Sequence, residues 1–308
     1  MASTDQRLPL TILCGKGGVG KTTLSLALAL RAALRGENAL VVTSHPLQEL
    51  AVSISLAGLK ERFPQAIAHL FVLHIDPREI LSNTVRQHIP SDFLAEAVVS
   101  SRIYQSLIEV APGLKELAFL GRLWNLAQQR APETNERKFS LLIWDAPATG
   151  HFLQTLQVSK NFETYLSGPF AELGGSLRDF FASPDNFALI PITTLEEMAV
   201  EETLDLVRAL GNELGIQPRR VICNLASPLL ATGDSAAPHG ISTLASVAAA
   251  DISLQFILSR QRVEQSLFER LRSTIRADYH IVTRHAARQT DLDLLLAIAE
   301  EMEGLPGN

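Results

Sequence analysis

Cysteine is scarce in this chain: Cys14 and Cys223 are the two cysteines among 308 residues. Both lie in short apolar runs typical of core strands, so we expect buried thiols and a reducing compartment. No C-x-x-C pair occurs. This absence argues against a zinc site built from such a pair and against an iron–sulfur cluster, which needs more thiolates.

Long apolar runs and a basic charge excess are also missing. No uncharged apolar run reaches about 18 residues, the length expected of a transmembrane helix, and the first residues lack the basic and apolar regions of a signal peptide. The 27 Lys and Arg against 33 Asp and Glu give a net charge of −6, which argues against general nucleic-acid binding. We therefore expect a cytoplasmic globular protein, with no nucleic acid among its partners.

A glycine-rich stretch is the most informative feature that is present. Residues 15–23 read Gly-Lys-Gly-Gly-Val-Gly-Lys-Thr-Thr, which matches the phosphate-binding P-loop pattern G-x-x-x-x-G-K-T. Its glycines let backbone N–H groups point at phosphate oxygens, and the next helix directs its positive end at the same place. We expect Lys21 to reach the β- and γ-phosphates of ATP and Thr22 to bind Mg²⁺. The nucleotide-binding residues expected here are Gly15, Lys16, Gly17, Gly18, Val19, Gly20, Lys21, Thr22 and Thr23.

The residues around this loop have the context that the motif requires. An apolar run over residues 10–14 predicts a strand before it, and the Ala/Leu-rich residues 24–34 predict a buried helix after it. Further strands alternate with helices along the chain, which predicts an α/β fold with a doubly wound, mostly parallel sheet in one P-loop domain over residues 1–308. These further strands are expected at residues 39–43, 70–75, 139–145, 187–193, 220–224 and 279–283.

Residues 78–137 lack strand signals and are longer than a plain crossover helix. We expect an inserted helical subdomain there, with helices over residues 81–88, 93–109 and 114–129; ordinary packing of these helices around the sheet is the alternative. More helices are expected at about residues 152–185. Residues 226–250 are rich in Ala, Ser, Gly and Pro and predict a flexible loop.

Asp145 ends a strongly apolar run, Phe-Ser-Leu-Leu-Ile-Trp-Asp, typical of a buried parallel strand. Ligand loops of α/β sheets follow the carboxyl ends of such strands. We expect Asp145 to bind Mg²⁺ together with Thr22, directly or through water. The alternative is an aspartate that caps a helix or turn.

A second lysine, Lys16, directly follows the first glycine of the loop. The pattern K-G-G-x-G-K-[ST] resembles the deviant Walker A ATPases, which include ArsA arsenite-pump ATPases, the factor that targets tail-anchored membrane proteins, MinD, ParA and nitrogenase iron protein. Further segments resemble the ArsA-like branch of that group. These segments are Ile75–Pro77, Pro112–Glu116, the Asp-Ala-Pro-Ala-Thr-Gly-His run of residues 145–151, Thr194–Thr203 and Asn224.

The resemblance implies a nucleotide-sandwich dimer, either a homodimer or a heterodimer with a paralogue, in which Lys16 touches the partner's nucleotide. It implies that Asn224 contacts adenine. Protein clients or membrane partners would bind the helical subdomain. The switch residues that it implies are Ser44, His45, Pro147, Thr149, Gly150 and His151.

One departure from the family bears on activity. His45 stands where the family has the aspartate that positions the attacking water. A histidine can act as a base near neutral pH, so we expect an ATPase with Lys16, Lys21 and His45 as catalytic residues. The alternative is a catalytically weak, nucleotide-dependent scaffold or pseudo-ATPase subunit. A MinD-like membrane switch is disfavoured because residues 291–303 are acidic.

Overall fold

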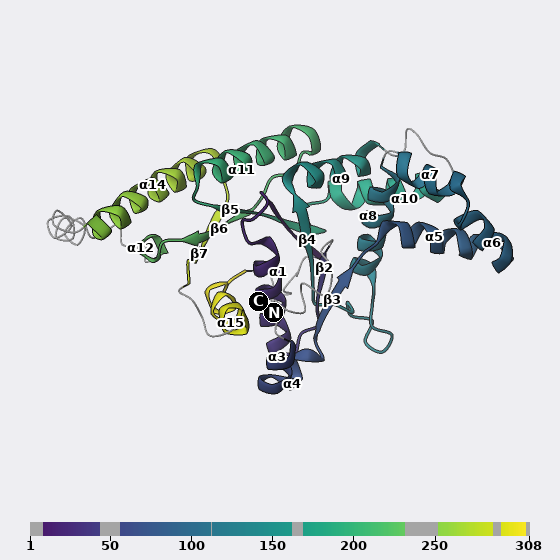
Figure 1. Ribbon diagram of the computed structural model, residues 1–308, viewed down its shortest axis with the longest axis horizontal. Coiled ribbons are helices and arrows are strands. Elements are labelled where there is room, and N and C mark those ends of the chain that lie inside the picture. Colours follow the sequence, from purple (N-terminus) through teal and green to yellow (C-terminus); the bar gives the residue numbers. More distant parts are fainter. Residues whose placement is uncertain are drawn as a thin grey trace, which may run out of the picture.

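The computed structural model describes residues 9–43, 56–111, 113–161, 169–231, 252–285 and 291–305. Its centre is a seven-stranded sheet in the order β3-β2-β4-β1-β5-β6-β7 (Figure 1). Every strand pair in this sheet is parallel, which confirms the α/β, doubly wound architecture expected from the sequence. The strands are β1 (Leu10–Gly15), β2 (Ala39–Thr43), β3 (Leu70–His74), β4 (Leu141–Ala148), β5 (Phe187–Thr194), β6 (Arg220–Ala226) and β7 (Asp278–Thr283).

Both faces of the sheet are apolar because its central strands are buried on both sides. Along β4, Ile143 packs in the cluster that includes α1 (Lys21–Leu34) and α15 (Asp291–Glu301). Its neighbour Trp144 points to the other face, where it packs against Phe119 and Phe152. The second face is covered by α8 (Leu114–Gln128), α9 (Thr149–Asn161) and α10 (Pro169–Ala182).

Two further helices cover the β5–β7 half of the sheet. Residues of α11 (Glu197–Ala209) and α14 (Ile252–Thr274) form one core cluster with β6. α11 continues into a π-helical turn, Leu210–Leu214, so this helical segment has a distorted end. The short helices α3 (Leu56–Arg62), α4 (Pro64–Ile67) and α12 (Pro228–Ala231) were not expected from the sequence.

The segment between β3 and β4 is helical, as expected. It contains α5 (Pro77–His88), α6 (Asp92–Val99), α7 (Arg102–Val110) and α8, and α5–α7 lie at the opposite end of the molecule from α14 (Figure 1). The single helix expected over residues 93–109 is wrong. The Ser101 hydroxyl accepts the N–H of Tyr104 and starts a new helix there, because a serine cap satisfies a free amide of the first turn.

Apolar side chains are unusually exposed on α6 and α7. Phe93 is 82% and Ile103 is 83% exposed, and they are joined by Leu94, Leu107 and Val110. We call these five residues the α6–α7 apolar surface. Within the residues that the structure describes, no helix is long and apolar enough to cross a membrane.

Candidate functional site

The loop between β1 and α1 is fixed by contacts that leave no room for side chains at two glycines. A Cβ on Gly15 would lie 2.2 Å from the backbone oxygen of Ile192 on β5, so only glycine fits there. Gly20 has a φ of 92° and forms the N-cap of α1, and a Cβ on it would lie 2.4 Å from Nδ2 of Asn224. The P-loop is therefore held between the ends of β5 and β6.

Lys21 begins α1 and its side chain folds back over this loop. Its Nζ donates to the backbone oxygens of Gly15 and Lys16, at 2.9 Å each. Burial lowers the pKa of the Lys21 ammonium, while the nearby Asp145 opposes that shift. The loop thus surrounds one partly buried cation and the amino end of a helix, a combination suited to an anion.

Three oxygen-bearing side chains meet at the carboxyl ends of β2 and β4. One carboxylate oxygen of Asp145 accepts the Thr22 hydroxyl at 2.7 Å and the Thr43 hydroxyl at 3.2 Å. Asp145 is only 1% exposed, and the parallel register sets Thr43 beside it. The sequence predicted that Thr22 and Asp145 act together, and the structure brings them together; it did not predict Thr43, whose one signal was its place at the end of a buried strand.

Oxygen ligands of this kind suit Mg²⁺, which usually takes one or two protein ligands together with substrate phosphates. The adjacent hydroxyl of Thr22 and carboxylate of Asp145 fit that requirement. In the described part of the chain no three His, Cys, Asp or Glu side chains come together as a separate metal site.

Asn224 lies on the other side of the P-loop, near the end of β6. Its Nδ2 donates to the backbone oxygen of Val19 at 2.8 Å, and the side chain is 4% exposed. Its Oδ1 is buried and has no hydrogen-bond partner among the residues that the structure describes. Because a buried polar atom without a partner is costly, this oxygen is suited to accept a hydrogen bond from a bound molecule.

Lys16 points away from the loop toward α11. Its Nζ lies 3.9 Å from a carboxylate oxygen of Glu202, and both side chains are about one-third exposed. The sequence did not single out Glu202, since nothing in the local pattern joins it to a residue so far away along the chain.

The expected switch residues are divided between two segments. Ser44 and His45 lie outside the residues that the structure describes. Pro147 lies near the end of β4, while Thr149 starts α9 with a buried hydroxyl that has no hydrogen-bond partner in the described part of the chain. Gly150 and His151 follow it and are exposed. This segment therefore connects the end of β4, which carries Asp145, to helix α9.

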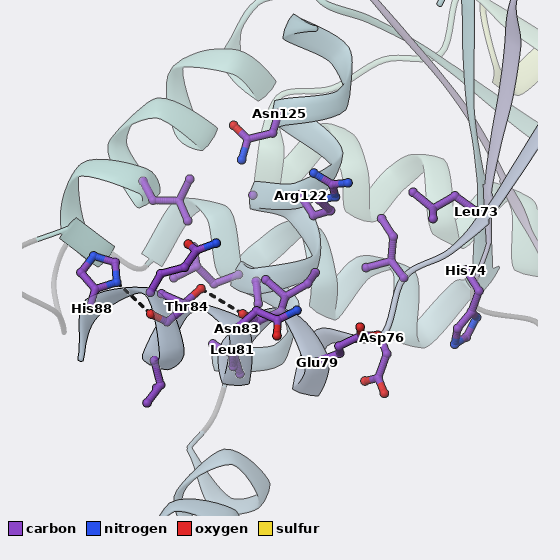
Figure 2. A pocket seen from close by; sticks show the side chains of 18 residues that line it. Leu73, His74, Asp76, Glu79, Leu81, Asn83, Thr84, His88, Arg122 and Asn125 are labelled. Atoms are coloured by element: carbon purple, nitrogen blue, oxygen red, sulfur yellow. Dashed lines mark hydrogen bonds between the residues drawn. The ribbon is translucent and has the colours of Figure 1, made fainter. Parts of the chain in front are cut away.

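A cavity of about 780 Å³ lies beside the helical region, at the end of β3. Figure 2 shows Asn83, Thr84 and His88 of α5 on one side and Arg122 and Asn125 of α8 on the other. Its walls also include the apolar side chains of Leu73, Ile75, Ile80, Leu81, Leu117 and Leu173. The cavity is thus apolar inside with polar groups along its edges, and it is separate from the P-loop.

Comparison with known proteins agrees with the phosphate-binding site described above. The family model described as "Anion-transporting ATPase" matches residues 9–180, more than half of the chain. "ATPase GET3" of Candida albicans (strain SC5314) is 30% identical over 176 residues, which cover 53% of this chain and 48% of that protein. "ATPase ASNA1 homolog 1" of Paramecium tetraurelia is 26% identical over 190 residues, or 59% of this chain and 55% of that protein. The chain matches about half the length of these relatives.

Proposed function

This chain belongs to the anion-transporting ATPase (ArsA) family, and we propose that it binds ATP with Mg²⁺ and hydrolyses it as a dimeric cytoplasmic switch. The observation that carries the proposal is the convergence of Lys21, Thr22 and Asp145 at one end of the parallel sheet. A cation for phosphates and two oxygen ligands for Mg²⁺ are the groups that phosphoryl transfer requires.

Lys21 and the loop amides would hold the phosphates. The Lys21 ammonium donates to two loop carbonyls, and we infer that it turns from them to the β- and γ-phosphates when ATP binds. Phosphate charge would also favour its protonated form and so oppose the effect of burial on its pKa. Thr22 and Asp145 would hold Mg²⁺, which when bound neutralises charge that develops on the phosphates.

Lys16 would act across a dimer interface, in a homodimer or in a heterodimer with a paralogue. Its ion pair with Glu202 of α11 supports this proposal, because the partly exposed Lys16 side chain is directed out of its own loop. Asn224 Oδ1 would accept from the adenine amino group, which matches its buried and unpartnered state.

Nucleotide state would be passed to a client through the helical subdomain, at about residues 78–137. The α6–α7 apolar surface supports this part of the proposal, since exposed apolar patches of this kind mark interaction sites. Pro147, Thr149, Gly150 and His151 would connect the two regions, because they join the strand that carries Asp145 to α9. The client itself would be a protein or a membrane partner with an apolar segment.

The test is steady-state ATP turnover with Mg²⁺, measured together with ATP binding. Wild type should release phosphate, and Lys21→Ala should lower turnover by at least about 100-fold. Lys21→Arg serves as a matched control for the charge, since it keeps the cation but not the compact ammonium. A wild type that binds no ATP would contradict the proposal.

A second function is favoured by His45, which replaces the family's switch aspartate. A chain that binds ATP and dimerises without turnover would be a nucleotide-dependent scaffold or pseudo-ATPase subunit. His45→Asp separates the two: a gain of turnover of about 100-fold or more would identify the scaffold. A loss of turnover in His45→Asp would identify His45 as part of the active machinery.

A further inference from the structure

Glu264 is a buried carboxylate that lies outside the phosphate site. It lies in the middle of α14 and is 3% exposed. One of its oxygens accepts the backbone N–H of Ser227 at 2.8 Å, and the other accepts from Nε of Arg260 at 2.9 Å. Burying a carboxylate costs free energy unless hydrogen bonds or a cation compensate for the lost water. The bonds to Ser227 and Arg260 supply that compensation, so Glu264 and the Ser227 backbone hold each other in place.

The segment that Glu264 holds directly follows Asn224. Leu225 has a φ of 57°, a left-handed conformation that costs a non-glycine residue energy and persists only where its surroundings fix it. The backbone oxygen of Ala226 accepts the N–H of Arg284, and Ser227 donates its N–H to Glu264. The pairing between β6 and β7 also shifts its register between Cys223 and Ala226. This irregular end of β6, which we call the Leu225–Ser227 turn, is thus fixed at both of the residues that follow Leu225.

This turn adjoins Asn224, whose own backbone pairs with Thr194 of β5. The Asn224 side chain is held by its hydrogen bond to the backbone oxygen of Val19 in the P-loop. The Asn224 backbone is followed directly by the left-handed residue Leu225. Recognition of adenine would require Oδ1 to stay in place, because a hydrogen bond from the adenine amino group forms only over a narrow range of distance and angle. Releasing Ser227 would allow Leu225 to relax and Asn224 to move.

We propose that Glu264 is a positioning residue for nucleobase recognition, which it serves by holding the Leu225–Ser227 turn so that Asn224 faces the base. The proposal rests on the proposed function, since it needs a nucleotide in the P-loop. It predicts an effect on the choice between ATP and GTP, because adenine carries an amino group where guanine carries a carbonyl. Contacts to the phosphates, which both nucleotides share, are made by other residues.

The experiment is calorimetric binding of Mg-ATP and Mg-GTP to the full chain, with thermal unfolding as a measure of folding. In Glu264→Ala the ratio of ATP to GTP affinity should fall by about tenfold, the effect of one lost hydrogen bond, with GTP affinity nearly unchanged. Glu264→Gln keeps the shape and one acceptor but loses the charge, and should lower the ratio by about threefold. Glu269→Ala is the matched control, since Glu269 is an exposed carboxylate on the same helix that accepts a hydrogen bond from its neighbour Gln265.

Variants that fold, lose thermal stability and keep the wild-type ATP to GTP ratio would overturn the proposal, because Glu264 would then be purely structural. If Glu264→Ala does not fold, an unchanged ratio in Glu264→Gln overturns it alone. A wild type that binds no nucleotide overturns the proposed function, and the role of Glu264 with it. A wild type that binds ATP and GTP equally overturns base recognition by Asn224 and leaves ATP binding itself intact.

Discussion

The Nζ of Lys16 lies 3.9 Å from a carboxylate oxygen of Glu202, so this P-loop lysine forms an ion pair within its own chain. If this lysine acts across a dimer, the pair must open when two chains meet on ATP. Glu202 of the same chain and the nucleotide of the partner chain would therefore compete for the Lys16 ammonium group.

Glu202→Gln should favour the ATP-bound dimer. A pair this exposed is worth no more than about 1 kcal/mol, so the dimer should tighten by up to about fivefold. Sedimentation at several protein concentrations, with ATP and Mg²⁺, measures this change. Glu197→Gln removes the same charge from the same helix and should have no effect; equal effects of both variants would indicate net charge rather than the pair.

Gly20→Ala should disrupt the nucleotide site. The added methyl group would lie 2.4 Å from Nδ2 of Asn224, at a residue with a φ of 92°. We expect a loss of about 2 kcal/mol in the free energy of unfolding and loss of ATP binding. Gly17→Ala is the control for stability alone, because Gly17 has no described protein atom outside its chain neighbours within 4 Å of an added methyl group. Denaturant unfolding of both variants and ATP titration of Gly20→Ala check this, and equal losses of stability in the two variants would contradict it.

Thr22→Ala should raise the Mg²⁺ concentration needed for half-maximal turnover by at least about tenfold. The variant removes the hydroxyl that lies 2.7 Å from Asp145 and would bind the metal with it. Thr22→Ser keeps the hydroxyl and should stay within about threefold of wild type. A Mg²⁺ titration of ATP turnover measures both, and an unchanged Mg²⁺ dependence in Thr22→Ala would remove Thr22 from the metal site.

Stability should fall in alkali because of Tyr279. Burial raises the pKa of its phenol to about 12 from an ordinary value near 10, and its hydroxyl donates to the backbone oxygens of Leu271 and Ile275. The native phenol therefore keeps its proton where the unfolded one loses it, so this contribution is complete below pH 10 and declines from pH 10 to 12.

Tyr279→Phe removes this titration and should flatten the loss of stability above pH 10. Urea unfolding at pH 9 to 11 measures it. Tyr104→Phe is the control, since the buried Tyr104 hydroxyl has no hydrogen-bond partner within the described ranges. Curves of the same slope for Tyr279→Phe and wild type would exclude Tyr279 as the source.

Phe93→Gln combined with Ile103→Gln should weaken client binding and leave ATP turnover unchanged. Both side chains are more than four-fifths exposed on the α6–α7 apolar surface, so their loss removes little core packing. We expect binding of a fluorescent apolar helical peptide to weaken by about tenfold. Met198→Gln, at an exposed apolar residue on α11, is the control, and weaker binding in that variant would indicate non-specific adhesion.

The sequence predicted the parts of the fold that local pattern determines. The inner parallel strands are buried on both faces and appear as short apolar runs, whereas the edge strands β3 and β7 are only partly buried but still carry apolar runs. All seven were therefore found with ends within a few residues. The P-loop was found because its glycines and Lys21 carry a fixed spacing. The break between α6 and α7 was missed although two serines, Ser100 and Ser101, interrupt the apolar residues there, and the cap at Ser101 decided the boundary.

Contacts between distant residues could not be read in the same way. Thr43, Glu202 and Glu264 each meet a functional segment through the folding of the sheet, not through neighbours in the chain. Asn224 was identified by resemblance alone, and its bond to Val19 follows from the placement of β6 two strands from β1. Local pattern fixes which elements form, whereas these partners depend on the order in which strands assemble.

The packing of α15 on α1 has a consequence for the timing of synthesis. Arg31 of the P-loop helix donates to the backbone oxygen of Met302, 271 residues later, and the two helices share one apolar cluster. In a growing chain, the apolar side of α1 that packs on α15 therefore stays exposed until α15 has left the ribosome. Because exposed apolar surface attracts chaperones and other nascent chains, the P-loop helix depends on a segment that is translated much later and becomes fully packed only after α15 has been made.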